Sequence, residues 1–151
     1  MIPLIVLVGM WALMRAAAKL LPFVNISPGT SGRVPLALML CMTGFAHFII
    51  PEQIALLVPP LAVEKSFIVY LTGGLEVMCA LGILIPQLRK TSGVILIFLL
   101  LAFIPANVYG ALNHVELGGH RLGPIYLLFR IPLQLFFVWW AWHFAARGEA
   151  A

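Results

Sequence analysis

The sequence predicts an all-α fold, a polytopic membrane helix bundle, and three observations lead to this fold class. The chain of 151 residues is 63% hydrophobic and only 9% charged, whereas soluble domains average about 45–50% apolar and about 25% charged residues. Its apolar residues form continuous runs near the ~20 residues needed to cross a bilayer. Strands of a membrane barrel would instead alternate over segments of ~10 residues. We therefore expect a single transmembrane domain, residues 1–151.

Five apolar runs are expected to span the membrane as helices. They are separated by turn-forming or charged residues and cover residues 2–21, 33–50, 66–86, 91–112 and 123–146. The first run resembles a cleaved leader in its position, but its basic residues, Arg15 and Lys19, follow the apolar stretch. A secretory leader carries its positive charge before the apolar stretch. We therefore interpret the first run as a retained transmembrane helix.

The segment between the second and third runs, residues 51–65, is apolar in its middle but too short and too interrupted by proline to span. It is expected to form a short interfacial or re-entrant segment that divides at Pro59 and Pro60. With Pro51 at its start, this segment is a candidate lid over a cavity between the helices. The connector of residues 25–32 is rich in Gly, Ser and Pro and is expected to be a turn.

Basic residues are distributed unequally between the two ends of the expected bundle. One end carries six of them: Arg15, Lys19, Arg33, Arg89, Lys90 and Arg147. The other end carries Lys65 and Arg121. Because cytoplasmic loops are enriched in Lys and Arg, the N-terminus is expected outside and the C-terminus in the cytoplasm. An interfacial aromatic belt is expected near the inner end, at Trp139, Trp140 and Trp142. The basic residues form no stripe, so no nucleic-acid partner is predicted.

Several polar side chains lie inside the expected spans. They come from four helices, and a rise of ~1.5 Å per residue places them in the outer half or near the middle of the membrane. They are Thr43, His47, Glu76, Asn107, Arg130 and Gln134. Glu76 and Arg130 are the acid and the base at this depth, so each is the other's expected counter-charge. Gly73 and Gly74 would let a neighbouring backbone approach closely.

Two interpretations of this polar cluster stay open. In the first, the side chains line a ligand pocket, because ionisable groups inside a membrane are commonly functional. In the second, Glu76 and Arg130 form a buried ion pair that only fixes the register of the helices. The two interpretations differ in whether the space between these two side chains is occupied by a ligand.

The remaining histidines and the cysteines are assigned structural roles. His114 and His120 fall in a polar loop and are expected to be solvated, whereas His143 is expected to anchor at the inner interface. Cys41 and Cys79 lie in apolar runs without a C-x-x-C spacing and are expected to be buried small hydrophobes. No metal site is predicted, because a metal needs several converging ligands and the histidine of the polar cluster has no second histidine at i+3 or i+4.

Five short motifs occur in order along residues 33–143: "TGFAHFIIPE", "VPP", "YLTGGLEVMCALGILIP", "IPANVYGALN" and "LLFRIPLQ". Their order and spacing resemble the DoxX/DoxD-like family of small bacterial membrane proteins. The resemblance implies a four-helix core in the bacterial inner membrane, here with an extra N-terminal transmembrane helix. It also implies relatives that are small subunits of a thiosulfate:quinone oxidoreductase, membrane partners of soluble redox or detoxification enzymes, or more distant assembly chaperones. The positions that match the family pattern are His47, Pro51, Pro59, Pro60, Glu76, Pro105, Asn107, Arg130 and Gln134.

These expectations describe an accessory or binding subunit of a membrane redox system. Its intramembrane pocket would be formed by His47, Glu76, Asn107, Arg130 and Gln134 and would bind a small amphipathic or quinone-like ligand. Arg130, Gln134 or a protonated His47 would donate hydrogen bonds to the carbonyls of a quinone headgroup.

An autonomous enzyme is not predicted. The sequence contains no nucleophile–base motif, phosphate loop or dinucleotide fingerprint, so the protein is expected to be at most a subunit of a quinone-linked oxidoreductase, and no catalytic residue is assigned. The alternative is a non-catalytic assembly partner, a membrane chaperone. The expected partners are the lipid bilayer, a membrane or soluble redox protein, and a second copy in a homodimer. A transporter is disfavoured because the sequence has no internal repeat.

Overall fold

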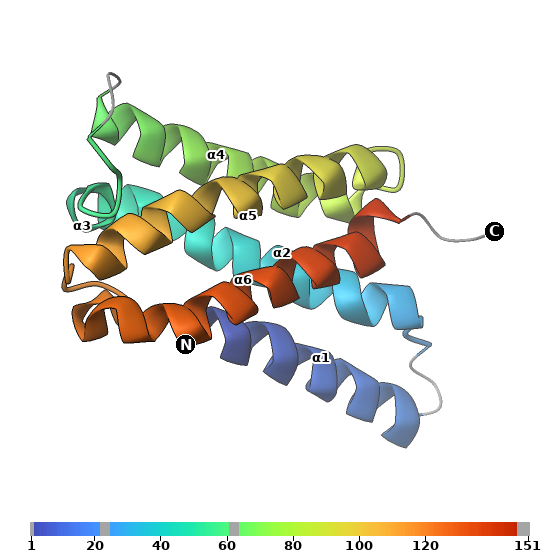
Figure 1. The fold of residues 1–151 in the computed structure, drawn as a ribbon. Coiled ribbons are helices and arrows are strands. Elements are labelled where there is room, and N and C mark those ends of the chain that lie inside the picture. Colours follow the sequence, from blue (N-terminus) through green and yellow to red (C-terminus); the bar gives the residue numbers. More distant parts are fainter. Residues whose placement is uncertain (1, 22–24, 61–63, 148–151) are drawn as a thin grey trace.

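The helices of the computed structural model lie side by side and alternate in direction, with the N-terminus and α3 at one end and the C-terminus at the other (Figure 1). The structure describes residues 2–21, 25–60 and 64–147. Its elements are α1 (Ile2–Leu20), α2 (Pro28–Ile49), α3 (Pro51–Ala55), α4 (Lys65–Leu84), α5 (Arg89–Leu112), η1 (His120–Tyr126), α6 (Leu127–Ala141) and η2 (Trp142–Ala146). No strand occurs within the described ranges. The predicted all-α bundle is confirmed.

Five stretches of the described chain are long and apolar enough to cross a membrane, judged by length and composition. They are α1, α2, α4, α5 and the combined stretch from His120 to Ala146. Each corresponds to one of the five apolar runs recognised in the sequence. The chain is therefore a multi-pass membrane protein.

The core lies between α2, α4, α5 and α6, and α1 packs on its outside. Leu36, Leu40, Ile83 and Leu96 are fully buried there. Along α1, by contrast, Leu7 is the one buried position that the structure describes. The helix packs on α2 and meets α6 through an edge-to-face contact of Trp11 with Trp140, and it lies at the outer edge of the bundle (Figure 1). Four helices enclose the core, and the N-terminal helix is an addition to it.

The helix α2 begins earlier than predicted. Residues 25–32 were expected to be a turn, yet the helix starts at Pro28. The Ser27 side chain caps it by accepting a hydrogen bond from the Thr30 backbone nitrogen (3.1 Å), and proline suits the first turn because its missing N–H needs no partner. Arg33 therefore lies within α2 and is buried, where the sequence placed it at the edge of a loop.

Removal of this cap tests the early start of α2. Ser27→Ala is expected to lower the free energy of unfolding by about 1 kcal/mol, because the Thr30 N–H loses its acceptor. The measurement is a denaturant titration of the protein in mild detergent. Ser27→Asp retains a capping oxygen and should behave like the wild type. Equal losses for both variants would contradict the capping role.

The other helix boundaries differ from prediction in smaller ways. The helix α4 ends at Leu84, two residues early, because the chain becomes extended at Ile85 before a proline. The basic pair assigned to the following loop, Arg89 and Lys90, forms the first turn of α5. The last span is not one uniform helix: η1 contains Gly123 at a φ of 69°, and the span ends in a π-helical turn, η2.

One predicted member of the aromatic belt is a core residue. Trp140 is buried, and its Nε1 donates a hydrogen bond to the Gly32 carbonyl (3.0 Å), which ties α6 to the start of α2. Trp139 and Trp142 are exposed, as a belt requires. The belt prediction is therefore wrong for Trp140 and agrees with the exposure of its two neighbours.

The predicted interfacial segment contains one short helix, α3, followed by a turn. Pro51 begins the helix, because an N-terminal proline loses no helical hydrogen bond. The turn reaches Pro59, which is half-buried, and Pro60, which is exposed. Residues 61–63 of the predicted segment lie outside the described residues.

A close helix contact joins α2 and α4 through two glycines. A methyl group at Gly73 would lie 2.5 Å from the His47 Cβ and 3.0 Å from the Gly44 carbonyl oxygen. A methyl group at Gly74 would meet nothing within 4 Å. The expectation of close backbone approach is therefore confirmed for Gly73 and wrong for Gly74. Small residues at such a crossing allow the backbones of membrane helices to approach.

Candidate functional site

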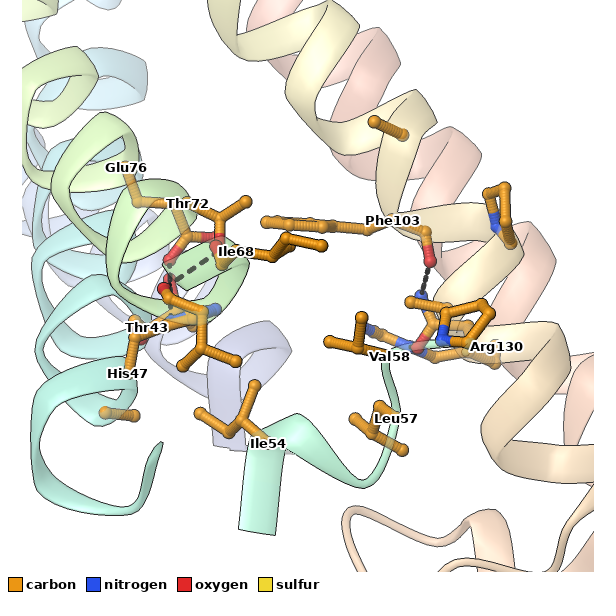
Figure 2. Close-up of a pocket in the computed structure, with 17 residues that line it drawn as sticks. Thr43, His47, Ile54, Leu57, Val58, Ile68, Thr72, Glu76, Phe103 and Arg130 are labelled. Atoms are coloured by element: carbon orange, nitrogen blue, oxygen red, sulfur yellow. Dashed lines mark hydrogen bonds and ion pairs between the residues drawn. The ribbon is translucent and has the colours of Figure 1, made fainter. Parts of the chain in front are cut away.

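A cavity of about 520 Å³ lies between the α2–α4 pair and the α5–α6 pair. The α3 segment lines it through Ile54, Leu57, Val58 and Pro59. Figure 2 shows Thr43, His47, Thr72 and Glu76 on one side and Arg130 on the opposite side, with apolar side chains between them. The walls are therefore mostly apolar and carry polar groups at two separated places.

Glu76 is the acidic group of this cavity. It projects from α4, is only 4% exposed, and lies beside the close glycine contact that packs α4 on α2. Its Oε2 lies 3.7 Å from His47 Nδ1. Within the part of the chain that the structure describes, Oε2 has no hydrogen-bond partner. A buried carboxyl oxygen without a partner is costly in an apolar environment, so this atom needs a donor from outside the described residues.

Three polar neighbours of Glu76 direct their protons at backbone carbonyls. The Thr43 hydroxyl donates to the Met39 carbonyl (3.1 Å), and His47 Nδ1 donates to the Thr43 carbonyl (2.9 Å). The Thr72 hydroxyl donates to the Ile68 carbonyl (2.8 Å). In a helix such i−4 bonds satisfy the side chain locally. Thr72 and His47 therefore do not supply the donor that Oε2 lacks, whereas the Thr43 hydroxyl also interacts with the Glu76 carboxyl group.

Arg130 stands on the opposite wall in a second polar group. Its Nε donates to Asn107 Oδ1 (2.8 Å), and Asn107 Nδ2 donates to the Phe103 carbonyl (2.8 Å). His120 Nε2 lies 3.2 Å from the same Asn107 oxygen. The amide of Asn107 is thus oriented by three partners, and it fixes Arg130 at the edge of the cavity.

The burial of His120 is a correction. The sequence placed it in a solvated loop, but it is 3% exposed because η1 folds the loop back against α5. Its Nδ1 lies 2.6 Å from the Leu117 carbonyl, and both neighbours of the ring are acceptors, so a neutral ring donates to one of the two. His114 and His143 are exposed, which agrees with their predicted roles.

Glu76 and Arg130 do not form the direct ion pair that the sequence suggested. No contact within 4.0 Å joins them among the described residues, and the basic group nearest the carboxylate is His47. The two charges interact electrostatically at longer range, and both line the same cavity. The reason is positional, because Asn107 holds Arg130 on the far wall.

Gln134 does not line the main cavity, although it was predicted to. It is fully buried and faces a smaller cavity of about 50 Å³, which also touches Glu76, Arg130 and Pro3 of α1. Its Nε2 donates to the Leu100 carbonyl (2.7 Å), and its Oε1 has no partner among the residues described.

Of the predicted lid prolines, Pro59 lines the main cavity, whereas Pro51 and Pro60 do not.

The apolar lining was not predicted. Ile54, Leu57, Ile68 and Phe103 belong to the lining, together with Thr72 as a polar member. A polar residue in an apolar run is conspicuous in a sequence, whereas an apolar cavity residue is indistinguishable from one that faces lipid. Across the described ranges, no group of three or more His, Cys, Asp or Glu side chains is placed to hold a metal ion.

The role of Asn107 can be tested by substitution. Asn107→Leu is expected to lower the free energy of unfolding by about 1–3 kcal/mol, because Arg130 Nε and His120 lose a buried acceptor. The matched control is Asn113→Leu, because Asn113 caps the C-terminal end of α5 and makes only the local bond to the Tyr109 carbonyl in an exposed position. Equal effects of the two substitutions in a detergent unfolding assay would contradict this role.

Comparison with protein-family models gives a match over most of the chain. The model of a family described as "Domain of unknown function (DUF8561)" matches residues 36–145. That range includes every polar residue of the main cavity and leaves α1 outside. No curated protein and no solved structure matches the chain.

Proposed function

The chain belongs to the DUF8561 family, whose description assigns no activity, and we propose from the cavity that the protein binds a small amphipathic molecule within the membrane. One observation carries the proposal: the buried Glu76 Oε2 lacks a donor and lines a mostly apolar cavity opposite Arg130. The cavity volume of about 520 Å³ lies within the about 300–1,000 Å³ of small-molecule sites. An apolar tail would pack on the walls and a polar head would reach the charged groups.

The wider role that we propose is that of an accessory or binding subunit of a membrane redox system. The support is the resemblance of the motifs around His47, Glu76, Asn107 and Arg130 to DoxX-like proteins. A quinone-like headgroup is the ligand suggested by that resemblance. The same resemblance is the reason to place the protein in a bacterial inner membrane, and the distribution of Lys and Arg is the reason to place its N-terminus outside. The end that carries α3, and with it the cavity, would then face outwards.

A second candidate function is that of a structural or assembly partner. The observation that favours it is the Asn107 network, because Arg130 Nε and His120 serve a buried amide and not the cavity itself. Under this alternative the cavity holds no specific ligand. The two functions therefore differ in one measurable property, the occupancy of the cavity.

Filling the cavity is the experiment that tests ligand binding. The purified protein is released from membrane nanodiscs, and molecules bound to it are identified by native mass spectrometry. The wild type is expected to retain an amphiphile, and Leu57→Trp is expected to lose it because Leu57 lines the cavity. Leu56→Trp is the matched control, because Leu56 is 57% exposed and lies outside the lining.

Two results would contradict the proposal. One is a wild type that retains no amphiphile while remaining folded. The other is equal retention by the two tryptophan variants, since annular lipid would be bound without regard to the cavity.

A further inference from the structure

The two walls of the main cavity differ in the hydrogen-bonding groups that they offer to a ligand. On the α2–α4 side, the hydroxyl protons of Thr43 and Thr72 and the Nδ1 proton of His47 are all donated to carbonyls of their own helices. The hydroxyl lone pairs, the second ring nitrogen of a neutral His47 and the Glu76 carboxyl group remain. When ionised, the carboxyl group offers acceptor oxygens only, and when protonated it adds one O–H donor. With Glu76 ionised, this wall therefore presents acceptors.

The opposite wall presents donors. The Arg130 guanidinium carries five N–H groups, of which Nε is used by Asn107. Among the described residues, the two terminal nitrogens of Arg130 have no hydrogen-bond partner, and the side chain lines the cavity. Asn107 adds no donor, because its Nδ2 is bound to the Phe103 carbonyl. The free donors of this wall therefore belong to Arg130.

The separation of acceptors and donors onto opposite walls restricts which polar head groups the cavity can bind. A head with two acceptors, such as the two carbonyls of an oxidised quinone, finds a donor at Arg130 only. The other two donors expected from the sequence are committed elsewhere: Gln134 Nε2 binds the Leu100 carbonyl outside this cavity, and His47 Nδ1 binds the Thr43 carbonyl. A second acceptor placed against an ionised Glu76 would leave two acceptors facing each other, which is unfavourable when buried.

Resting on the proposed function, we infer that the ligand is an uncharged amphiphile with a hydroxyl group directed at Glu76 and an acceptor oxygen directed at Arg130. Phenols and quinols that carry a second oxygen on the far side of the ring belong to this class. A neutral head suits the site, because an ionised Glu76 balances the charge of Arg130 and the walls are largely apolar. The site is therefore expected to select ligands that carry a hydrogen-bond donor, and not only ligands of a suitable shape.

Two matched probes test the inference on the full-length wild type in detergent. Butyl para-hydroxybenzoate carries the hydroxyl donor and an ester acceptor, and butyl para-methylbenzoate replaces the hydroxyl with a methyl group of similar size. The hydroxy ester is expected to bind at least about tenfold more tightly in calorimetric titrations. The methyl ester is the more hydrophobic probe, so partition into detergent or unspecific packing would produce the opposite order.

Two variants test which side chain causes the preference for the hydroxy ester over the methyl ester. In Glu76→Leu the ratio of the two affinities is expected to fall to within about twofold, because the acceptor is gone. In Arg130→Met both probes are expected to weaken together and the ratio to persist, because the ester acceptor is common to both. A merely structural role for Glu76 would change both affinities without changing their ratio, and the wild-type comparison decides the matter even where a variant does not fold.

The outcomes separate this inference from the function on which it rests. Equal affinities of the two probes, both lost in Leu57→Trp, would overturn the donor inference and leave ligand binding in place. Binding of neither probe by a wild type that nevertheless retains an endogenous amphiphile would also overturn the inference alone. Binding of neither probe together with no retained amphiphile would overturn both.

Discussion

Exchange of Arg130 for methionine is expected to weaken binding of butyl para-hydroxybenzoate at least about tenfold and to lower the free energy of unfolding by as much as about 3 kcal/mol. The binding loss follows from removal of the free donors on the α5–α6 wall. The stability loss has two sources: Asn107 Oδ1 loses its shortest bond, and the buried Glu76 loses the positive charge across the cavity. Calorimetric titration measures the first effect, and denaturant unfolding in detergent measures the second.

A matched control separates these effects from a general loss of positive charge. Arg121→Met changes an exposed arginine outside the lining of the cavity and should alter neither quantity. The double variant Glu76→Leu with Arg130→Met should be less destabilised than the sum of the single changes, by about 0.5–3 kcal/mol, because no buried charge is then left without its counter-charge. Strict additivity would contradict the coupling between the two walls.

Gly73→Ala is expected to destabilise the bundle by about 1–3 kcal/mol, whereas Gly74→Ala is expected to leave its stability unchanged or slightly higher. The new methyl group at Gly73 would lie 2.5 Å from His47 Cβ and 3.0 Å from the Gly44 carbonyl, so α2 and α4 must separate. A methyl group at Gly74 has no neighbour within 4 Å. The two adjacent positions thus form a matched pair in one helix, and unfolding in detergent compares them directly.

The same two glycine variants test whether the packing of α2 on α4 affects ligand binding. His47 and Glu76 lie on either side of the contact that Gly73 makes, so separation of α2 and α4 should also weaken binding of the probe in Gly73→Ala. Gly74→Ala should bind as the wild type does. Equal stability of the two variants would contradict the close contact of α2 with α4. A stable Gly73→Ala with unchanged binding would do so as well.

The spans of the fold were predictable because each is a continuous apolar run, a pattern that depends on composition alone. The start of α2 was not assigned correctly, although Ser27 followed by Pro28 is a helix-start signal, because the glycines that follow suggested a turn. The break in η1 depends on Gly123, whose positive φ is available to glycine. Gly123 is followed by Pro124, a pair that signals a turn, but it opens the apolar run that was predicted as a single helix.

Individual residues of the candidate site were predictable where a polar side chain interrupts an apolar run. His47, Glu76, Asn107 and Arg130 are polar residues in apolar runs, and all four line the main cavity. The gap between Glu76 and Arg130 depends on helix separation and on the bond from Arg130 to Asn107, neither of which the sequence displays.

Two further errors have the same origin in tertiary structure. Gln134 shares a helix face with Arg130 but faces the smaller cavity, because side chains such as Phe103 lie between the two spaces and line both. His120 looks solvated in a polar loop, and its burial follows only when η1 folds against α5. Sequence spacing gives the face of a helix, whereas the partition of the space between helices requires the packed structure.

Photolabelling tests the location of the ligand site most directly. A para-hydroxybenzoate ester with a diazirine in its alkyl tail is irradiated with the full-length protein in nanodiscs, and labelled peptides are sequenced by mass spectrometry. Labels are expected on cavity residues such as Leu57, Ile68 and Phe103, and excess unlabelled butyl ester should prevent them. Labels confined to exposed positions such as Met78 and Phe98, and insensitive to the competitor, would contradict a ligand site between the α2–α4 and α5–α6 walls.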